Sequence, residues 1–348
     1  ILKKKTKFNI IYELIMQFVS CIIIGGAVIS AYAGDILVGN VMSYVRSVGL
    51  VQSNSQAIMA NIYTIYNSSL YMDMLFEFLN YCGNSKKSID KKKLNSQISS
   101  VNIKNLSFSY KNKKNVLKNI NISLQKGEKV ALVGPNGSGK STLIKILSGL
   151  YEIRAGDILI NDISLKDIDI EDYYTKISVL FQDFVKYELT LQENIGFGDM
   201  KNFHSTENMK TVLDKLQATF LKRNENYDLS MQLGNWFEEG QQLSQGQWQK
   251  VALARAYFKD ASIYILDEPN AALDTVSERE IFDNFFEISR EKIGIFISHR
   301  LSAAKMADKI IVMNKGEIVG IGNHDELLKN CPIYQILYQA EIYENKEE

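Results

Sequence analysis

Cysteine and surplus charge are the two features that this sequence has little of. It has three cysteines, Cys21, Cys82 and Cys331, which lie far apart and form no paired spacing. Such a distribution argues against a disulfide framework or a zinc site, and it suits a reducing compartment. Lys plus Arg and Asp plus Glu number 40 each, so the formal net charge is +0. We expect no nucleic-acid partner, because a phosphate backbone selects proteins with an excess of basic charge.

The length and composition leave room for a folded protein of two domains. The chain has 348 residues, of which 46% are hydrophobic and 23% are charged. These proportions are typical of proteins that bury a core, and they disfavour disorder as the main state. The sequence contains no internal repeat, so we expect one copy of any functional unit.

The N-terminal part contains a long apolar run. Residues 10–33 carry Glu13 as their only charge, and as a helix they are long enough to cross ~30 Å of hydrocarbon. Four lysines within the first seven residues precede the run, and the chain starts at Ile1 rather than Met. We expect a transmembrane helix and further sequence upstream of it. A signal peptide and a buried core helix remain as alternatives.

A second long segment, residues 41–79, follows a glycine-containing break. Arg46 is the only ionisable side chain in its first thirty residues, yet serine, asparagine, glutamine and tyrosine recur. This mixture predicts a membrane helix that turns a polar face to a bundle interior and continues as a stalk. A soluble amphipathic helix is the alternative. Basic residues flank the two segments at their outer ends, so both ends should be cytoplasmic.

The whole chain therefore divides into four parts. Residues 1–83 are expected to form a partial transmembrane domain. Residues 84–100 are rich in lysine, serine and asparagine, which is typical of a solvated linker. From residue 101 to 343, short alternating or apolar runs interleave with helical segments, and residues 344–348 form a tail. This order predicts an α/β domain with a largely parallel sheet.

A glycine-rich motif lies between an apolar strand, residues 129–133, and the helix expected after it. It matches G-x-x-x-x-G-K-[ST], a loop that binds phosphates. The backbone N–H groups of such a loop point at phosphate oxygens, its lysine adds a positive charge, and its serine hydroxyl ligates Mg²⁺. A glycine-rich turn that binds nothing is the alternative. The candidate nucleotide-binding residues are Gly134, Pro135, Asn136, Gly137, Ser138, Gly139, Lys140, Ser141 and Thr142.

Two adjacent carboxylates follow a second apolar strand, residues 263–266. Asp267 and Glu268 then lie at the carboxyl end of a strand, where ligands bind in open α/β sheets. Asp267 suits a direct or water-mediated Mg²⁺ contact, and Glu268 suits the orientation or deprotonation of an attacking water. A simple turn before Pro269 is the alternative.

Between these motifs stands Leu243-Ser-Gln-Gly-Gln247, which resembles the LSGGQ signature of ATP-binding-cassette (ABC) proteins. Further positions resemble the same family. Tyr110 resembles the aromatic residue that stacks on adenine, and Gln182 resembles the glutamine that links the Mg²⁺ site to the transmembrane domain. His299 resembles the switch histidine that contacts the γ-phosphate, and residues 271–274 resemble the D-loop.

The resemblance implies a P-loop NTPase fold with a RecA-like core, an antiparallel β subdomain and a helical subdomain. It also implies a homodimer or heterodimer, because the phosphate loop and the signature of one domain cannot reach each other. Ser244, Gly246 and Gln247 would then contact the ATP of the partner. Two positions depart from the family pattern: Gln245 replaces the commoner glycine, and Asn270 replaces the commoner threonine or serine.

The implied cofactors are ATP and Mg²⁺. The metal ligands would be Ser141, Gln182 and Asp267, and the catalytic residues would be Glu268, His299 and Gln182.

The resemblance also implies ATP-driven export across a membrane. Residues 233–240, with Trp236, and the later Trp248 resemble bacterial peptide exporters of the lantibiotic type. We therefore expect a half-transporter in the cell membrane, with its ATPase domain in the cytoplasm and a peptide as the exported substrate. The alternatives are a soluble ABC-type ATPase that acts on nucleic acid or ribosomes, an importer-type cassette, and a non-transporting ATP-binding remnant of an exporter.

Overall fold

The computed structural model describes residues 2–83, 91–111, 113–269, 275–298 and 300–347. These residues belong to two compact units, Ile1–Ile89 and Asp90–Glu348. The first unit is a pair of long helices, and the second is a mixed α/β domain.

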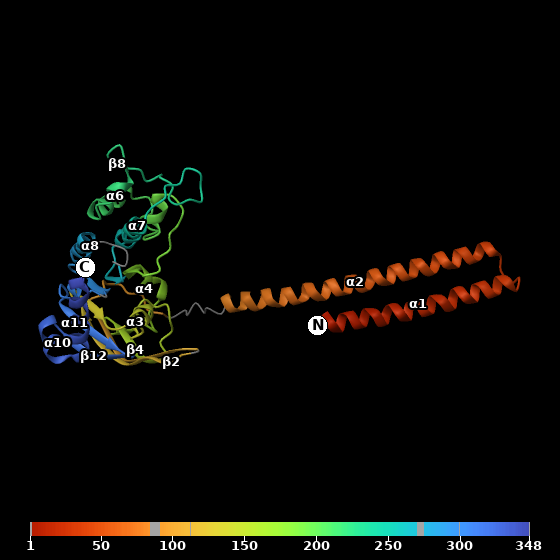
Figure 1. Cartoon of the computed structure of the whole chain (residues 1–348), viewed down its shortest axis with the longest axis horizontal. Helices are drawn as coiled ribbons and strands as arrows, with labels where there is room; N and C mark the ends of the chain where they lie inside the picture. Colours follow the sequence, from red (N-terminus) through yellow and green to blue (C-terminus); the bar gives the residue numbers. More distant parts are fainter. Residues whose placement is uncertain (1, 84–90, 112, 270–274, 299, 348) are drawn as a thin grey trace. The chain divides into compact units, whose positions relative to one another are not determined.

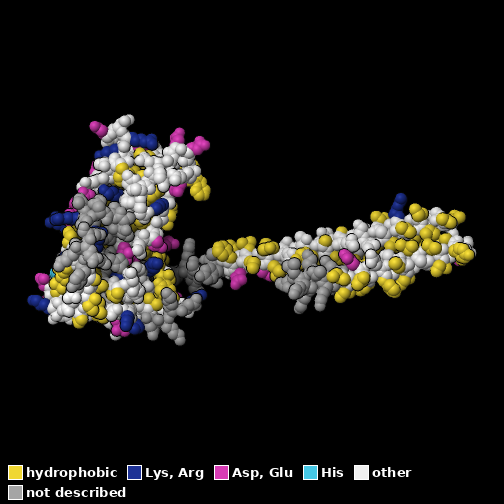
Figure 2. All heavy atoms as spheres, viewed as in Figure 1, with side chains coloured by type: hydrophobic (Ala, Val, Ile, Leu, Met, Phe, Trp, Pro, Cys, Tyr) yellow, Lys and Arg dark blue, Asp and Glu magenta, His cyan; other side chains and the backbone are white. Residues whose placement is uncertain are grey.

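The first unit is a helical hairpin of α1 (Leu2–Tyr32) and α2 (Val38–Gly83) (Figure 1). The Tyr12 hydroxyl donates to Ser55 Oγ at 2.5 Å and links the two helices. Among the described residues, one helical stretch, Ile10–Tyr32, is long and apolar enough to cross a membrane, with a mean hydropathy of 2.2. Figure 2 shows hydrophobic side chains exposed along both helices, a surface that requires lipid or further protein to cover it.

The second expected segment, residues 41–79, lies within α2 and is helical throughout. Within the part of the chain that the structure describes, α2 has 46 residues and is long enough to cross a membrane, but it does not reach the mean hydropathy that qualifies α1 as a span. Its recurring polar side chains are the reason, because each of them lowers the mean hydropathy of any window that contains it.

The second unit begins with a four-stranded antiparallel sheet, in the order β2-β1-β4-β5. In β1, Val101 and Ile103 are 0% and 3% exposed, because alternate side chains of a strand share one face, and Leu106, 0% exposed, returns to that face after an irregularity in the pairing of β1 with β2. The antiparallel subdomain expected from the sequence is therefore present. Its strands are β1 (Ser100–Tyr110), β2 (Lys113–Gln125), β4 (Ala155–Ile160) and β5 (Ile163–Ser164).

Residues 91–99 belong to the expected linker, yet they pack onto the domain. Leu94 and Ile98 are buried within its hydrophobic core, and the Leu94 N–H donates to Asp172 Oδ2 at 2.6 Å. The lysine- and serine-rich surroundings of these two residues conceal their apolar character in the sequence. The described part of the expected linker is thus an element of the domain.

A six-stranded sheet forms the core of the second unit, in the order β12-β11-β3-β10-β9-β6. All neighbouring strands in it are parallel except β12, which pairs antiparallel with β11. The central strands are buried on both faces, as parallel strands covered by helices require. The strands are β3 (Lys129–Val133), β6 (Ile177–Leu180), β9 (Ile263–Asp267), β10 (Ile293–Ile297), β11 (Lys309–Asn314) and β12 (Glu317–Gly322).

Helices cover the core sheet, and a helical lobe containing α6, α7 and β8 extends from it (Figure 1). Three of the described helices begin with capping boxes: Thr190 with Glu193 at α5, Ser244 with Gln247 at α7, and Asn323 with Glu326 at α10. The lobe also contains a 3₁₀ turn and a small hairpin, η1 (Thr219–Leu221), β7 (Lys222–Arg223) and β8 (Asn226–Tyr227). The α-helices are α3 (Lys140–Leu147), α4 (Ile170–Lys176), α5 (Leu191–Gly196), α6 (Thr206–Lys215), α7 (Gln245–Phe258), α8 (Thr275–Ile288), α9 (Leu301–Ala304), α10 (His324–Asn330) and α11 (Pro332–Glu347).

Candidate functional site

The phosphate loop connects β3 to α3, as the sequence predicts. Gly134 and Gly139 have φ angles of 148° and 107°, which favour glycine. A Cβ atom at Gly134 would lie 2.1 Å from the Met313 carbonyl oxygen, and one at Gly139 would lie 2.7 Å from Leu117 Cδ2. Close packing and backbone conformation therefore both require glycine at these two positions.

A backbone hydrogen bond ties the phosphate loop to the turn between β11 and β12, and a second one ties that turn to β2. The Gly316 N–H donates to the Ser138 carbonyl oxygen at 3.0 Å, and the Lys118 N–H donates to the Gly316 carbonyl oxygen at 2.8 Å. The Ser138 hydroxyl is buried and has no hydrogen-bond partner within the described residues. The loop is thus bonded to the β11–β12 turn, and it contains a buried polar atom that remains to be satisfied.

Lys140 is the first residue of α3 and is 5% exposed. Its ammonium donates to the carbonyl oxygens of Gly134 at 2.7 Å and Pro135 at 3.3 Å. Burial lowers the pKa of Lys140, and the carboxylates of Glu268 and Asp267 partly oppose this shift. A buried cation therefore lies inside the loop, held by carbonyl oxygens that phosphate oxygens can replace.

Asp267, Glu268 and Gln182 meet where β9 and β6 end. Asp267 is 2% exposed and accepts a hydrogen bond from the Ser141 hydroxyl at 3.4 Å. Burial raises the pKa of Asp267, although the Ser141 hydrogen bond partly offsets this. Glu268 has a φ of 52°, and its Oε2 accepts from Gln182 Nε2 at 2.5 Å. Such a positive φ at a non-glycine residue is more frequent at functional sites than elsewhere.

Tyr110 ends β1 within a cluster of aromatic rings. Its ring centroid lies 5.0 Å from that of Phe108 and 5.5 Å from that of Tyr151. Its hydroxyl is 3.2 Å from the Thr142 hydroxyl, and a hollow of about 600 Å³ opens beside Tyr110, Tyr151 and Arg154. The structure therefore places Tyr110 next to the phosphate loop. The sequence did not identify Phe108 and Tyr151, although the alternation of β1 places Phe108 on the same face as Tyr110.

The signature residues begin α7 in the helical lobe. Ser244 is the N-cap, its Oγ accepts from the Gln247 N–H at 3.3 Å, and its own N–H donates to Gln247 Oε1 at 2.9 Å. Ser244 and Gln245 are exposed, Gly246 lies in the first turn, and Trp248 is buried in the core. This N-terminus can therefore receive an anionic group from outside the domain.

Two predicted elements lie outside the described residues, namely His299 and residues 270–274, which include Asn270 and the D-loop-like segment. β10 pairs with β9 in parallel, and Ile297 lies opposite Asp267. The chain that leads towards His299 therefore leaves the sheet at the same edge as Asp267.

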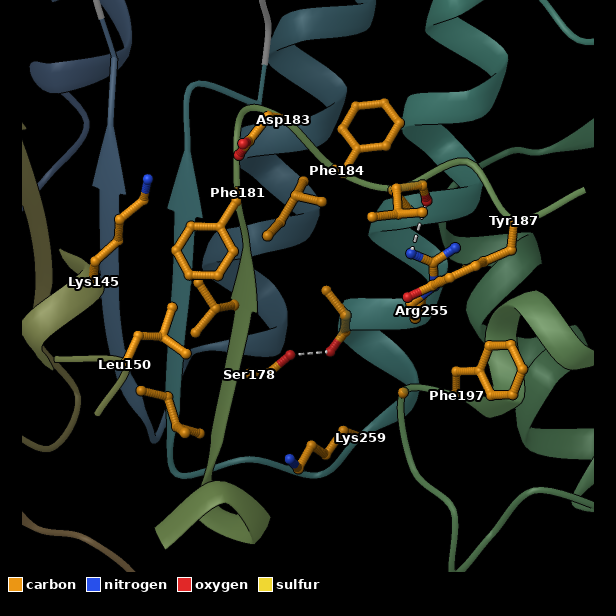
Figure 3. Close-up of a pocket in the computed structure, with 17 residues that line it drawn as sticks. Lys145, Leu150, Ser178, Phe181, Asp183, Phe184, Tyr187, Phe197, Arg255 and Lys259 are labelled. Atoms are coloured by element: carbon orange, nitrogen blue, oxygen red, sulfur yellow. Dashed lines mark hydrogen bonds between the residues drawn. The ribbon is translucent and has the colours of Figure 1, made fainter. Parts of the chain in front are cut away.

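The glutamine loop, residues 181–190, borders a cavity of about 500 Å³ (Figure 3). Phe181 and Phe184 pack against the two hydrophobic clusters of the domain, so Gln182 lies between two anchored aromatic rings. Figure 3 shows the Arg255 side chain, which comes from α7, beside the Tyr187 ring. The sequence did not identify Arg255, because its partners are distant along the chain.

A family match and two similar proteins indicate the same kind of protein. Residues 117–271 match the protein family described as ABC transporter. The subtilin transport ATP-binding protein SpaT of Bacillus subtilis is 59% identical over 346 residues, which cover 99% of this chain and 56% of that protein. The nisin transport ATP-binding protein NisT of Lactococcus lactis subsp. lactis is 50% identical over 350 residues, which cover 100% of this chain and 58% of that protein. The chain thus spans little more than half the length of these relatives.

A solved structure, that of a bacterial Atm1-family ABC exporter with ATP bound, has a similar fold. It matches with a TM-score of 0.72 at 24% sequence identity, over 97% of this chain and 58% of that chain. The predicted order of two helices followed by an α/β domain with antiparallel and helical subdomains is confirmed. The phosphate loop, the signature and the carboxylates all lie within residues 117–271. We conclude that residues 117–271 belong to an ABC transporter ATP-binding domain.

Proposed function

We propose that the second unit binds ATP and hydrolyses it to drive the export of a peptide across a membrane. One observation carries the ATPase part of this proposal. Lys140, Ser141, Gln182, Asp267 and Glu268 come from three separate segments and lie at one edge of the core sheet. A buried cation, a hydroxyl and two carboxylates in this arrangement suit a nucleotide with its metal ion.

The metal ion would be Mg²⁺. Ser141, Gln182 and Asp267 supply a hydroxyl, an amide and a carboxylate, which are the oxygen donors that Mg²⁺ takes beside phosphate and water. The pKa of Asp267 is raised by burial, and a neighbouring cation would favour its ionised form. Nowhere in the described residues do three or more His, Cys, Asp and Glu side chains gather as an alternative site. When bound, Mg²⁺ supplies charge neutralisation to the phosphates.

Glu268 would orient the water that attacks the γ-phosphate and accept its proton, so that ATP and water yield ADP and phosphate. The positive φ of Glu268 and its hydrogen bond to Gln182 limit where its carboxylate can lie. Lys140 would exchange its loop carbonyls for phosphate oxygens. We propose that His299 contacts the γ-phosphate.

A second copy of the chain would complete the site. Ser244, Gly246 and Gln247 present the N-terminus of α7 on the helical lobe, whereas the phosphate loop lies at the core sheet. The Ser244 hydroxyl, the free N–H groups and the helix dipole would receive the γ-phosphate of ATP bound by the other copy. A homodimer meets this need with one kind of chain.

Two further observations support the proposal of peptide export. The names of the two relatives refer to subtilin and nisin transport, and Ile10–Tyr32 can cross a membrane by its length and hydropathy. We propose that α2 is a second span that turns its polar face to a pathway. The protein would then be a multi-pass protein of the cell membrane with its second unit in the cytoplasm. Uptake of subtilin or nisin by inverted vesicles that contain the chain, with and without ATP, tests this part.

Lys140→Ala tests the ATP site itself. We expect affinity for MgATP to fall by about 10- to 150-fold, because charge-assisted hydrogen bonds contribute roughly 1.5–3 kcal/mol. Equilibrium binding of a fluorescent ATP analogue measures the change. Lys145→Ala is the matched control, since Lys145 lies in the last turn of the same helix and should leave affinity unchanged. Equal affinities of the parent and Lys140→Ala would contradict the assigned site.

A further inference from the structure

Arg255, in the last turn of α7, connects the signature helix to the glutamine loop (residues 181–190). Its Nε and Nη2 donate to the carbonyl oxygen and Oδ1 of Asn194 at 2.8 and 3.0 Å. Its Nη1 donates to the Val185 carbonyl oxygen at 3.2 Å, and its guanidinium carbon lies 4.5 Å from the Tyr187 ring centroid. Figure 3 shows the side chain between the helix and the loop. Arg255 thus contacts the loop and the helix that follows the loop.

Asn194 extends these contacts along the loop. It is 0% exposed, and its Nδ2 donates to the carbonyl oxygens of Tyr187 at 2.8 Å and Thr190 at 3.0 Å. Because Arg255 binds both oxygens of Asn194, it also fixes the direction in which this amide points. Together the two side chains hold residues 185–190, the C-terminal half of the glutamine loop.

The N-terminal half of the loop is held by other contacts. β6 ends at Leu180, and Phe181 and Phe184 pack into the hydrophobic clusters. Gln182, between them, is exposed and donates to Glu268 Oε2. A loop held at both ends restricts the positions that Gln182 can take, so its bond to Glu268 depends on both sets of contacts.

The chemistry of this position suits arginine. Its planar guanidinium has donors in a fixed fork, which can bind two segments at once. Burial lowers the pKa of Arg255, but an arginine side chain stays protonated, so the acceptors around it compensate a buried charge. A lysine would keep the charge but lacks the fork, and it could not reproduce three hydrogen bonds to two residues.

We infer that Arg255 is a positioning residue for Gln182, and that it makes the glutamine loop follow the orientation of α7, which begins at Ser244. The inference rests on the proposed ATP hydrolysis. The three hydrogen bonds of Arg255 go to Val185 and Asn194, so its effect on hydrolysis reaches Gln182 through the loop. A change at the signature helix is thereby conveyed to the residues around Glu268.

A double-mutant cycle on the full chain tests this role. Arg255→Met should lower kcat for ATP hydrolysis about tenfold or more while KM for ATP changes less than about twofold, since Lys140 and Tyr110 are untouched. In a Gln182→Ala background, the same Arg255→Met change should alter kcat less than about twofold, because no glutamine remains to be positioned. Arg255→Lys should give an intermediate kcat in the parent background.

Lys259→Met is the matched control for loss of a cation beside the same cavity. Lys259 is the C-cap of α7, and its ammonium donates to the Tyr174 carbonyl oxygen, outside the glutamine loop. The Lys259→Met change should leave kcat unchanged in both the parent and the Gln182→Ala background. ATP binding by each variant shows that its domain is folded. If Arg255→Met does not fold, Arg255→Lys can replace it in the comparison with and without Gln182→Ala.

Equal losses of kcat in both backgrounds would overturn the inference, because they would show that Arg255 acts independently of Gln182. A loss confined to KM would overturn it as well. A parent chain that hydrolyses no ATP would refute the proposed function itself. This outcome differs from equal losses of kcat in the two backgrounds, which would refute only the role of Arg255.

Discussion

Glu268→Gln should slow ATP hydrolysis by ~10²–10⁴-fold, the usual contribution of a positioned general base, while leaving ATP binding intact. The amide keeps the size of the side chain, so the hydrogen-bonded position beside Gln182 can persist. It cannot accept a proton from the attacking water, so kcat falls and KM does not rise. Steady-state hydrolysis by the full chain and equilibrium binding of an ATP analogue separate the two effects.

Glu317→Gln is the control for this substitution. Glu317 lies in β12, where it forms an exposed ion pair with Lys118 at 3.2 Å, and exposed pairs of this kind contribute little. Its loss should leave hydrolysis at the parental rate. If Glu268→Gln also hydrolyses ATP at the parental rate, Glu268 is not the base.

Ser244→Arg should lower hydrolysis by ~10²–10³-fold, the effect of removing one donor from a preorganised anion site. The long side chain would occupy the exposed N-terminus of α7, where the γ-phosphate of the other copy would bind. ATP binding to the phosphate loop of the same chain should persist, since that loop belongs to the core sheet. We expect the parent to show a rate per chain that rises with protein concentration, and the variant to show no such rise.

Loss of the N-cap is the competing explanation for such a result, since it costs about 1 kcal/mol of stability. Asn323→Arg controls for it, because Asn323 is the N-cap of α10 and its side chain accepts from the Glu326 N–H at 2.9 Å in a capping box of the same kind. Thermal unfolding of both variants measures the stability change directly. A hydrolysis rate for Ser244→Arg equal to that of Asn323→Arg would contradict a role for the signature in a shared site.

The sequence predicted those parts of the site that depend on short segments. The phosphate loop follows from a strand, a glycine pattern and a helix within one stretch, and β9 delivers Asp267 and Glu268 to its carboxyl end. Apolar runs of this kind are buried on both faces, so their direction and their neighbours follow from few rules.

Contacts between distant segments could not be predicted in this way. Arg255 lies 61 residues from Asn194 and 70 from Val185, and nothing in the local pattern of α7 indicates that it turns towards them. Leu94 is a similar case, because its burial depends on a surface made by residues such as Asp172, 78 positions away. Only the folded chain brings such pairs together.

The hydrogen bond that ties the phosphate loop to the β11–β12 turn bears on how quickly nucleotide can be exchanged. The close approach of Gly134 to the Met313 carbonyl oxygen and the bond from Gly316 to Ser138 fix the loop before any nucleotide arrives. The entropy of ordering this loop is lost during folding, so little of it opposes binding. In the proposed cycle, ATP entry would need no rearrangement of the loop backbone, and product release and the separation of the two copies would set the rate.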